Sequence, residues 1–528
     1  MSERRARWIA FALAIVLPPL RLAPLWSGRL RSDDEHVFLG LAFIPKDFVS
    51  YAAFMAQARR SGRFLLTNDF TLEPQEGRYV LLFHWLVGRI AAWLDAEVIA
   101  VWPVLQALAG SALLLGVWRL LRVYFPEPRV RLLAFALVGF AGGLEWVVWQ
   151  LGDLLPPQAR DAAVLACWPL LSWNTFEGLF NPLQTTAYAA MIWLLVWLEA
   201  AARARRPLRA LLAFAVVPAM YSVHGYTAIA CGAVLACAFA LVALRIARGD
   251  RTRFAELLTL GIAGSAFLVP LAISQWQSQD AVFRGTSQAM VGASQVYAFW
   301  WWPLTFGALL VLGVRGAWLL ARRADAGAFP FALLAGWLGA GVLLGHLPFF
   351  SAYKFLFVLH VPLCIAAAAA LAAWRRPSPL AVAALALVLG ATNVNVLRDS
   401  LDEVAEPSPI FYLPRAHHEA LVAMRELPPG NVFASPVTGA YVPWLAEHPV
   451  YLGQWFLSLE PEAKWRRVKR FFAEDTPTAW RRAFLAENGI RYLIYGPAER
   501  KLGPLDPALP LVPVLERGDL RVYRVPPG

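Results

Sequence analysis

Apolar segments recur along the first three quarters of the chain, separated by short polar stretches. Most run for about 20 residues, the length that an α-helix needs to cross the hydrocarbon core of a bilayer. The segment 160–173 is shorter and suits a re-entrant or interfacial helix. The pattern predicts a polytopic α-helical membrane protein with about 11–13 transmembrane helices. The candidate spans are 8–26, 78–95, 98–121, 130–150, 160–173, 181–202, 208–223, 225–247, 254–274, 297–321, 328–347, 353–374 and 378–397.

The pattern changes after residue 397. Short apolar runs that end in turns, NVFASP at 431–436 and RYLIYGP at 491–497, predict buried strands. The stretches EAKWRRVKRFFAE and TAWRRAFLAENG have helical spacing, and a hairpin is expected around Gly518-Asp519. We therefore predict a small α/β domain over 398–528, which follows a transmembrane domain over 1–397.

The loop at 27–77 contains the stretch FIPKDFVSYAAFMAQARRSGRF, which predicts a short amphipathic helix beside the membrane. Asp47 stands at its start, where a carboxylate would cap the helix by accepting free backbone N–H groups. A carboxylate there would also bind a divalent cation or take a proton from an acceptor hydroxyl. The two interpretations are compatible. The apolar positions of this helix are Phe48, Tyr51, Ala52 and Met55.

Composition and charge agree with a membrane protein. The chain is 59% hydrophobic and 16% charged, whereas soluble domains carry roughly 25% charged residues. Its net charge of +12 lies entirely in residues 1–397, in arginine clusters between apolar segments. No basic groove with interleaved aromatic residues appears, which argues against nucleic-acid binding.

The arginine clusters also predict an orientation. Under the positive-inside rule most of them face the cytoplasm, which places the N-terminus inside and both the loop at 27–77 and the tail outside. The cluster RVYFPEPRVR at 122–131 conflicts with this topology.

Several polar side chains lie at the predicted outer ends of spans, where charge is costly and points to function. His224 separates two spans, and His346 ends another. Lys354 opens the next span and is, with Lys46, one of the two lysines of the membrane portion. Its ammonium would either reach the interface or bind a lipid-linked phosphate. A lone histidine near a helix end is more often structural, but a common outer location favours a shared cavity.

Two further groups lie in predicted outer loops. Asp280 and Arg284 belong to 275–296, whose Ser, Gln and Gly content suits a mobile loop that orders over a substrate. The cluster Asp33-Asp34-Glu35-His36 is typical of a solvated loop, and Asp34 is a weak candidate for a metal ligand. Glu145 and Glu177 are also candidates, on a side of the membrane that the sequence leaves open.

These motifs resemble the GT-C superfamily of integral-membrane glycosyltransferases, which includes protein O-mannosyltransferases and aminoarabinose transferase. The resemblance rests on D-x-x-x-Y at the start of the juxtamembrane helix, here Asp47 and Tyr51, and on a Gly-aromatic step about 15 residues later at Gly62-Arg63-Phe64. Further points of resemblance are NPLQTTAYAAMIWLLVWL at 181–198, His224 before a span, and Lys354 before VLHVPL.

The resemblance implies transfer of a sugar from a polyprenyl-phosphate donor to a glycan, lipid or protein acceptor on the outer face of the bacterial cytoplasmic membrane. It makes Asp47 the candidate base and Lys354 the cation for the departing phosphate. The other candidate substrate-binding residues are Tyr51, His224, His346, Asp280 and Arg284.

The resemblance also bears on a metal requirement. Many members carry two adjacent acids in this motif, whereas Phe48 follows Asp47 here. Dependence on Mg or Mn is therefore left open, with Asp47 and Asp34 as candidate ligands.

Two other classes of function remain as alternatives. A transporter or lipid flippase would have inverted repeats and ionisable residues near mid-span, and no repeat is visible in the sequence. A non-catalytic protein of envelope assembly would keep the architecture without needing Asp47. No Walker loop, GxSxG elbow, HExxH or CxxC motif supports ATP-driven transport or hydrolase chemistry.

Overall fold

A computed structural model describes residues 1–41, 45–151, 154, 156, 158, 174–291, 302–323, 328–347, 352–374 and 378–526. The chain forms two compact units, each built from three separate stretches. We call the first the helical unit; it comprises Met1–Ala23, Pro103–Ile273 and Ala293–Asp399. We call the second the mixed unit; it comprises Pro24–Trp102, Ser274–Gly292 and Ser400–Gly528. The tail thus belongs to the same unit as the first loop.

Helices of three turns or more make up most of the helical unit. In chain order they are α1 (Glu3–Arg21), α5 (Val98–Tyr124), α6 (Pro128–Phe140), α10 (Pro182–Arg203), α11 (Ala213–Val223), α12 (Gly225–Ala247), α13 (Phe254–Ser265), α17 (Ala308–Ala321), α18 (Phe329–His346), α19 (His360–Ala372) and α20 (Pro379–Glu403). Shorter elements of this unit are α7 (Glu145–Leu151), α9 (Thr175–Gly178), η3 (Pro207–Leu212), η4 (Arg251–Arg253), α16 (Trp302–Phe306) and η6 (Ala352–Leu359). The helices α14 (Leu268–Gln277) and α20 start in this unit and end in the mixed unit, and α5 starts in the mixed unit.

The predicted membrane architecture is confirmed. Within the described residues, 7 helices are long and apolar enough to cross a membrane, or up to 8 if α1 and α2 (Ala23–Leu30), bent by 44°, form one span. Two shorter apolar helical stretches, Pro207–Val223 and Ala308–Ala321, add to these. The chain is a multi-pass membrane protein.

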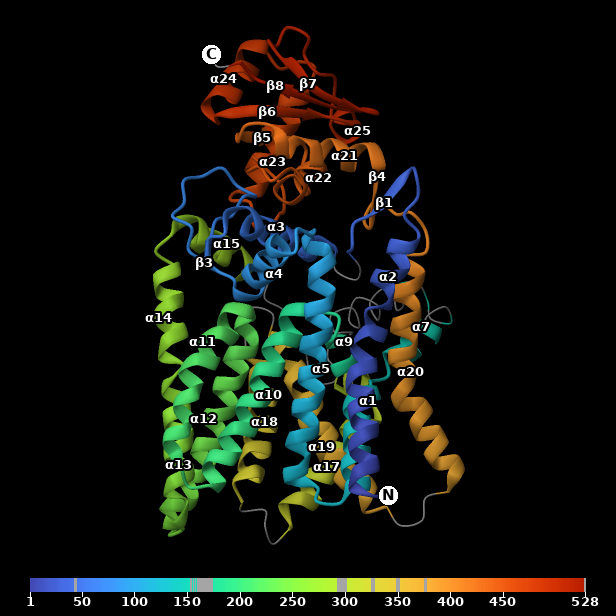
Figure 1. The fold of residues 1–528 in the computed structure, drawn as a ribbon, viewed down its shortest axis with the longest axis vertical. Helices are drawn as coiled ribbons and strands as arrows, with labels where there is room; N and C mark the ends of the chain where they lie inside the picture. Colours follow the sequence, from blue (N-terminus) through green and yellow to red (C-terminus); the bar gives the residue numbers. More distant parts are fainter. Residues whose placement is uncertain are drawn as a thin grey trace. The chain divides into compact units, whose positions relative to one another are not determined.

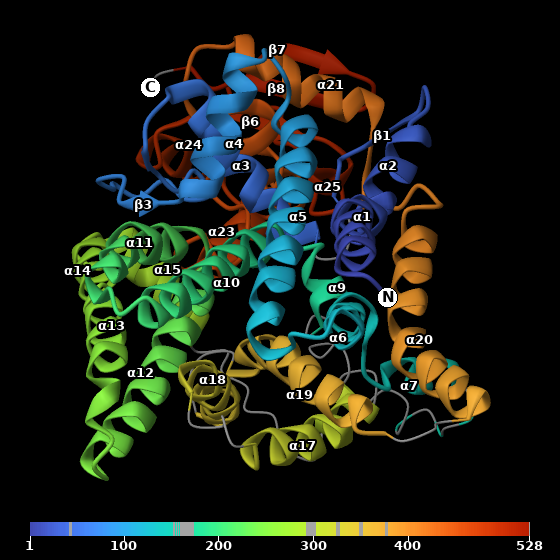
Figure 2. The same ribbon diagram turned by 60° about the horizontal axis from the view of Figure 1, so that its bottom comes forward.

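The helix α19 lies at the centre of the helical unit. Its residues from His360 to Ala370 are all buried, as expected for a helix that is apolar on every side. Figure 2 shows α17, α18 and α19 as neighbours. A Cβ at Gly316 of α17 would lie 1.7 Å from the Ala366 carbonyl oxygen of α19. The glycine therefore permits the close backbone approach that is typical of membrane helix pairs.

Two predicted elements of the membrane portion differ in the structure. The expected span at 78–95 contains α4 (Leu82–Trp93), whose 12 residues extend for about 18 Å, short of the roughly 30 Å of a hydrocarbon core. This helix packs on α3 (Pro45–Ser61), because Gly88 leaves room for the Met55 carbonyl. The prediction of a mobile loop at 275–296 was wrong, since α14 and α15 (Ala281–Val291) occupy most of it. The segment 160–173 lies outside the described residues.

The tail contains the predicted small α/β region. Its four-stranded sheet has the order β5 (Asn431–Phe433), β6 (Ile490–Tyr495), β8 (Leu520–Arg524), β7 (Val512–Arg517), and Figure 1 shows β6, β8 and β7 side by side. The β5–β6 pair is parallel and the others are antiparallel. The hairpin between β7 and β8 turns at Gly518, whose φ of +55° suits glycine. Packed around the sheet and the rest of the tail are α21 (Arg415–Ala423), η7 (Met424–Glu426), α22 (Pro436–Gly439), η8 (Val442–Ala446), α23 (Pro461–Phe472), α24 (Thr478–Glu487) and α25 (Pro497–Arg500).

The first loop and the tail are joined by backbone pairing within the mixed unit. The strand β1 (His36–Phe38) pairs antiparallel with β4 (Tyr412–Pro414). The strands β2 (Leu65–Leu66) and β3 (Tyr79–Val80) pair inside the first loop. The loop that carries α3 is therefore fastened to the tail in the folded unit.

Candidate functional site

Asp47 lies in the first turn of α3 and is half-buried. The helix begins at Pro45, a residue that suits a first helical position, so Asp47 does not occupy the cap position that its sequence context predicted. A negative charge in the first turn still complements the helix dipole. The hydroxyl of Ser50 donates to the Asp47 carbonyl at 2.6 Å. The side chain of Lys46 lies outside what the structure describes.

Tyr51 lies one turn after Asp47, so the two side chains share a face of α3. Burial raises the pKa of Tyr51, and the Asp47 carboxylate adds to this effect, so the phenol stays protonated at neutral pH. Phe48, in contrast, is 2% exposed, with its ring 4.9 Å from Trp102 and 5.5 Å from Tyr51. Phe48 therefore occupies, as a core side chain, the position at which many members of the GT-C superfamily carry a second acid.

His84 of α4 is a neighbour of Tyr51 that the sequence interpretation missed. Its ring meets the Tyr51 ring edge-on at 5.4 Å and is 2% exposed. Neither ring nitrogen has a hydrogen-bond partner among the described residues. Burial lowers the pKa of His84 to about 3, so the imidazole is neutral at pH 7. A lone histidine inside the apolar run LLFHWLV was the available signal.

The acidic cluster at 33–36 is organised by its own backbone. The Asp33 carboxylate accepts the N–H groups of His36 (2.6 Å) and Glu35 (2.8 Å), which lowers the pKa of Asp33. Asp34 is exposed. Within the described ranges, no group of three or more His, Cys, Asp or Glu side chains is arranged to hold a metal ion. Among these described residues, neither Asp34 nor Asp47 belongs to such a group.

Asp280 and Arg284 flank the start of α15. Asp280 is 5% exposed, and its two carboxylate oxygens accept the backbone N–H groups of Phe283 (2.9 Å) and Glu76 (2.8 Å). These bonds cap the helix and fasten it to the first loop. Arg284 is exposed, with its guanidinium 3.4 Å from the Ser278 carbonyl oxygen. The contacts of Asp280 favour a structural role.

We expect Asp280→Ala to lower the free energy of unfolding by about 1–2 kcal/mol, because two backbone N–H groups lose the carboxylate that accepts from them. The Michaelis constant for a substrate should stay within about twofold, since a cap does not touch substrate. Thermal unfolding and turnover of the purified protein measure the two effects. Asp475→Ala, at an exposed tail position, is the matched control. Unchanged stability with a raised Michaelis constant would instead assign Asp280 to substrate binding.

In the helical unit, His224 and Lys354 come together around Tyr226. The Lys354 ammonium lies 5.1 Å from the Tyr226 ring centroid, and the His224 ring centroid lies 5.7 Å from it. His224 joins α11 to α12, and its Nδ1 lies 2.7 Å from the Thr227 hydroxyl. The structure thus groups two predicted site residues through an aromatic residue that the sequence did not single out.

His346 has different neighbours. It ends α18 and stacks on Trp302 with ring centroids 5.4 Å apart and planes inclined by 11°. This stacking contact explains a histidine at the helix end, and the explanation does not require a substrate.

A buried ion pair lies deeper in the helical unit. The Arg21 guanidinium and the Glu177 carboxylate are 3.2 Å apart, and both side chains are 0% exposed. Arg21 also lies over the Phe180 ring at 4.4 Å. The sequence marked Glu177 but missed Arg21, although a charge inside the first apolar span was the signal. A second buried acid, Glu145, accepts a hydrogen bond from the Thr392 hydroxyl at 3.1 Å.

A cavity of about 10 Å³ lies beside α9 and α10. Polar side chains of Asn174, Gln184 and Thr185 line it. Its volume suits about one water molecule, so it is too small to mark the place of a sugar.

Comparison with known proteins shows a likeness of structure. No protein-family model and no curated protein matches the sequence. The oligosaccharyltransferase of Archaeoglobus fulgidus, tethered with an acceptor peptide, is similar over 93% of this chain and 69% of that chain, with a TM-score of 0.51 and 15% identity. The arabinofuranosyltransferase AftD from Mycobacteria is similar over 100% of this chain, with a TM-score of 0.52 and 16% identity. This chain spans 40% of the AftD chain.

Identities this low establish the fold alone. Both similar structures have the GT-C architecture that the Asp47–Tyr51 motif and the succession of apolar segments predict. The same archaeal enzyme in complex with Zn and sulfate is similar with a TM-score of 0.51 over 92% of this chain and 67% of that chain, at 14% identity. The chain is therefore a multi-pass membrane protein with the GT-C fold.

Proposed function

We propose that the protein is a membrane glycosyltransferase that moves a sugar from a polyprenyl-phosphate carrier to an acceptor on the outer face of the bacterial cytoplasmic membrane. The observation that carries this proposal is the GT-C fold, shared over almost the whole chain with two enzymes named for sugar transfer. The acceptor is proposed to be a glycan, a lipid or a protein, and the acceptor peptide tethered to the archaeal enzyme supports the last of these. The N-terminus is proposed to be cytoplasmic and the tail extracytoplasmic.

Asp47 is our candidate general base. In the reaction, the acceptor hydroxyl loses its proton to the carboxylate while its oxygen bonds to the anomeric carbon of the sugar. The bond from that carbon to the phosphate oxygen breaks, and polyprenyl phosphate leaves with the electron pair. A half-buried carboxylate in a first turn suits this role, because it is held in place and remains reachable.

Lys354 is our candidate for binding the donor phosphate. Lys354 is half-buried and its ammonium already lies over the Tyr226 ring, an arrangement that stabilises a cation beside an aromatic face. A fixed positive charge stabilises the negative charge that develops on a departing phosphate. His224 and Tyr226 shape the surroundings of this ammonium.

We expect Lys354→Met to lower kcat/KM for a polyprenyl-phosphate sugar by about 10- to 100-fold, because a hydrogen bond to a charged group contributes about 1.5–3 kcal/mol. Lys354→Arg should keep part of the activity, since it keeps the charge with a different shape. Lys501→Met, at an exposed tail position, is the control. Unchanged kcat/KM in Lys354→Met would remove Lys354 from donor binding.

The proposed function is tested by incubating the purified protein with polyprenyl-phosphate sugars and acceptors and measuring released polyprenyl phosphate. A glycosyltransferase releases the lipid carrier and labels the acceptor. A flippase would move the donor across a vesicle membrane without releasing it, and an assembly protein would do neither. Either of these outcomes, obtained across several donor sugars, would overturn the proposal.

A further inference from the structure

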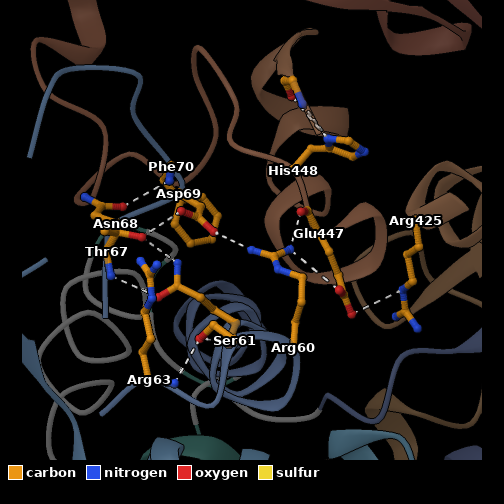
Figure 3. Close-up of polar contacts among 12 residues, drawn as sticks. Arg60, Ser61, Arg63, Thr67, Asn68, Asp69, Phe70, Arg425, Glu447 and His448 are labelled. Carbon is orange, nitrogen blue, oxygen red and sulfur yellow. Dashed lines mark hydrogen bonds and ion pairs between the residues drawn. The ribbon is translucent and has the colours of Figure 1, made fainter. Parts of the chain in front are cut away.

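A chain of alternating charges lies at the C-terminal end of α3, inside the mixed unit (Figure 3). Arg60 of α3 lies 3.5 Å from Asp69 and 3.6 Å from the Glu447 carboxylate, and it also donates to the Glu447 carbonyl. Glu447 comes directly after η8 in the tail. One side chain of α3 thus binds both the side chain and the backbone of a single tail residue.

The same chain of charges continues to the turn between α4 and α5. Arg425 of the tail lies 3.6 Å from Glu447 and 2.9 Å from Glu97. Arg59 of α3 closes the chain, 3.6 Å from Glu97 and 3.5 Å from Asp95. Each arginine lies between carboxylates, so the charges are satisfied within the protein and do not form a site for an ion.

The backbone of Glu447 is unusual. Its φ of +59° lies in the left-handed region, and it is one of four non-glycine residues with positive φ in the described part of the chain. Asp95, another of the four, belongs to the same chain of charges. Glycine would adopt this conformation without the steric cost of a Cβ. Glu447 adopts this conformation while its side chain pairs with Arg60 and Arg425.

The side chains of these ion pairs are partly withdrawn from water. The Glu447 side chain is 13% exposed, Arg425 is 16% exposed and Arg60 is 39% exposed. Ion pairs that are partly withdrawn from water are screened less than surface pairs. The preceding element, η8, is a π-helix of buried residues, a form that is frequent at functional sites.

We propose that Glu447 is a positioning residue through which the tail sets the direction of α3 and therefore the place of Asp47. This inference rests on the proposed function, in which Asp47 is the base. Asp47 and Arg60 are separated by roughly 20 Å of helix, so a tilt of about 3° at the Arg60 end moves Asp47 by about 1 Å. A displacement of that size can cost about 100-fold in rate.

The test uses the full-length protein with Glu447→Gln, which keeps the shape, and Glu447→Gly, which relieves the backbone. The control is Glu516→Gln, which breaks a tail ion pair to Arg521 at 2.8 Å, far from α3 in the sequence. Three quantities are measured: kcat and KM for a polyprenyl-phosphate sugar, amide hydrogen exchange in residues 48–61, and the thermal unfolding temperature.

We expect both Glu447 variants to lower kcat by about 10- to 100-fold with KM within about twofold, and to speed amide exchange in α3. Glu447→Gly should unfold at or above the temperature of Glu447→Gln, because its backbone is relieved. Wild-type kcat in Glu447→Gly would overturn the proposal, and so would unchanged exchange in α3. A merely structural role would lower the unfolding temperature without a selective loss of kcat.

A second experiment combines Arg60→Met with the Glu447 variants. If Arg60 and Glu447 act through one contact, the double variant should have about the same kcat as either single variant. Independent, multiplying losses would contradict the proposal. Amide exchange can be measured without turnover. If the wild-type protein releases no polyprenyl phosphate, the proposed function is overturned. The effect of Glu447 on the amide exchange of α3 can still be measured in that case.

Discussion

Asp47→Asn is expected to lower kcat for sugar transfer by about 10²- to 10⁴-fold, the range that a positioned general base contributes. The amide has the shape of the carboxylate but does not accept the proton of the acceptor hydroxyl. The effect should appear in kcat with little change in the Michaelis constant for the donor, since the carboxylate acts on the acceptor. Release of polyprenyl phosphate from a polyprenyl-phosphate sugar measures it.

The fold of this variant should be preserved. Asp47 lies in the first turn of α3, where the loss of a negative charge costs about 0.3–1 kcal/mol. Asp34→Asn is the control, because Asp34 is an exposed acid of the same loop and the other candidate metal ligand. Its kcat should stay within about twofold of the wild-type value. Full activity in Asp47→Asn would exclude Asp47 as the base, and a large loss in Asp34→Asn would reopen a metal role for the loop.

Glu177→Gln is expected to destabilise the protein by about 3–5 kcal/mol, the cost of leaving one partner of a buried ion pair uncompensated. Both side chains are 0% exposed. The Nε and Nη1 atoms of Arg21 already have no hydrogen-bond partner among the described residues. A neutral amide would leave the guanidinium in an apolar interior, over the Phe180 ring, without a counter-charge.

The measurement is thermal unfolding of the purified protein in detergent, with two comparisons. Glu516→Gln breaks the pair with Arg521, whose two side chains are 53% and 54% exposed, and should cost about 0.5 kcal/mol. The double variant Arg21→Met with Glu177→Met should recover much of the stability that the single change loses, because no buried charge remains. A double variant less stable than Glu177→Gln would contradict this account.

The two predictions concern different units and different kinds of evidence. Asp47 was singled out by sequence, and the structure adds its half-buried position and the contact between the rings of Phe48 and Tyr51. The ion pair of Arg21 and Glu177 was found only in the structure, since its members are 156 residues apart. The first prediction concerns the rate of sugar transfer, and the second concerns the stability of the fold.

Much of the architecture follows from local pattern. The apolar segments predict the membrane helices because a bilayer demands about 20 apolar residues in a row. The spacing of Phe48, Tyr51 and Met55 predicts α3, and alternating short strands and helices predict the α/β region of the tail. Asp47 and Tyr51 fall on one face of α3 by the helical repeat alone.

The sequence by itself thus determined the membrane class, the helix that carries Asp47 and the character of the tail, because each depends on residues close together in the chain. Only the tertiary structure decided that α4 packs on α3, that Asp280 caps a helix and that Glu447 of the tail binds Arg60 of the first loop. These last two residues are 387 positions apart. Contacts of that separation depend on how the chain packs in three dimensions, which no local period of hydrophobic and polar residues encodes.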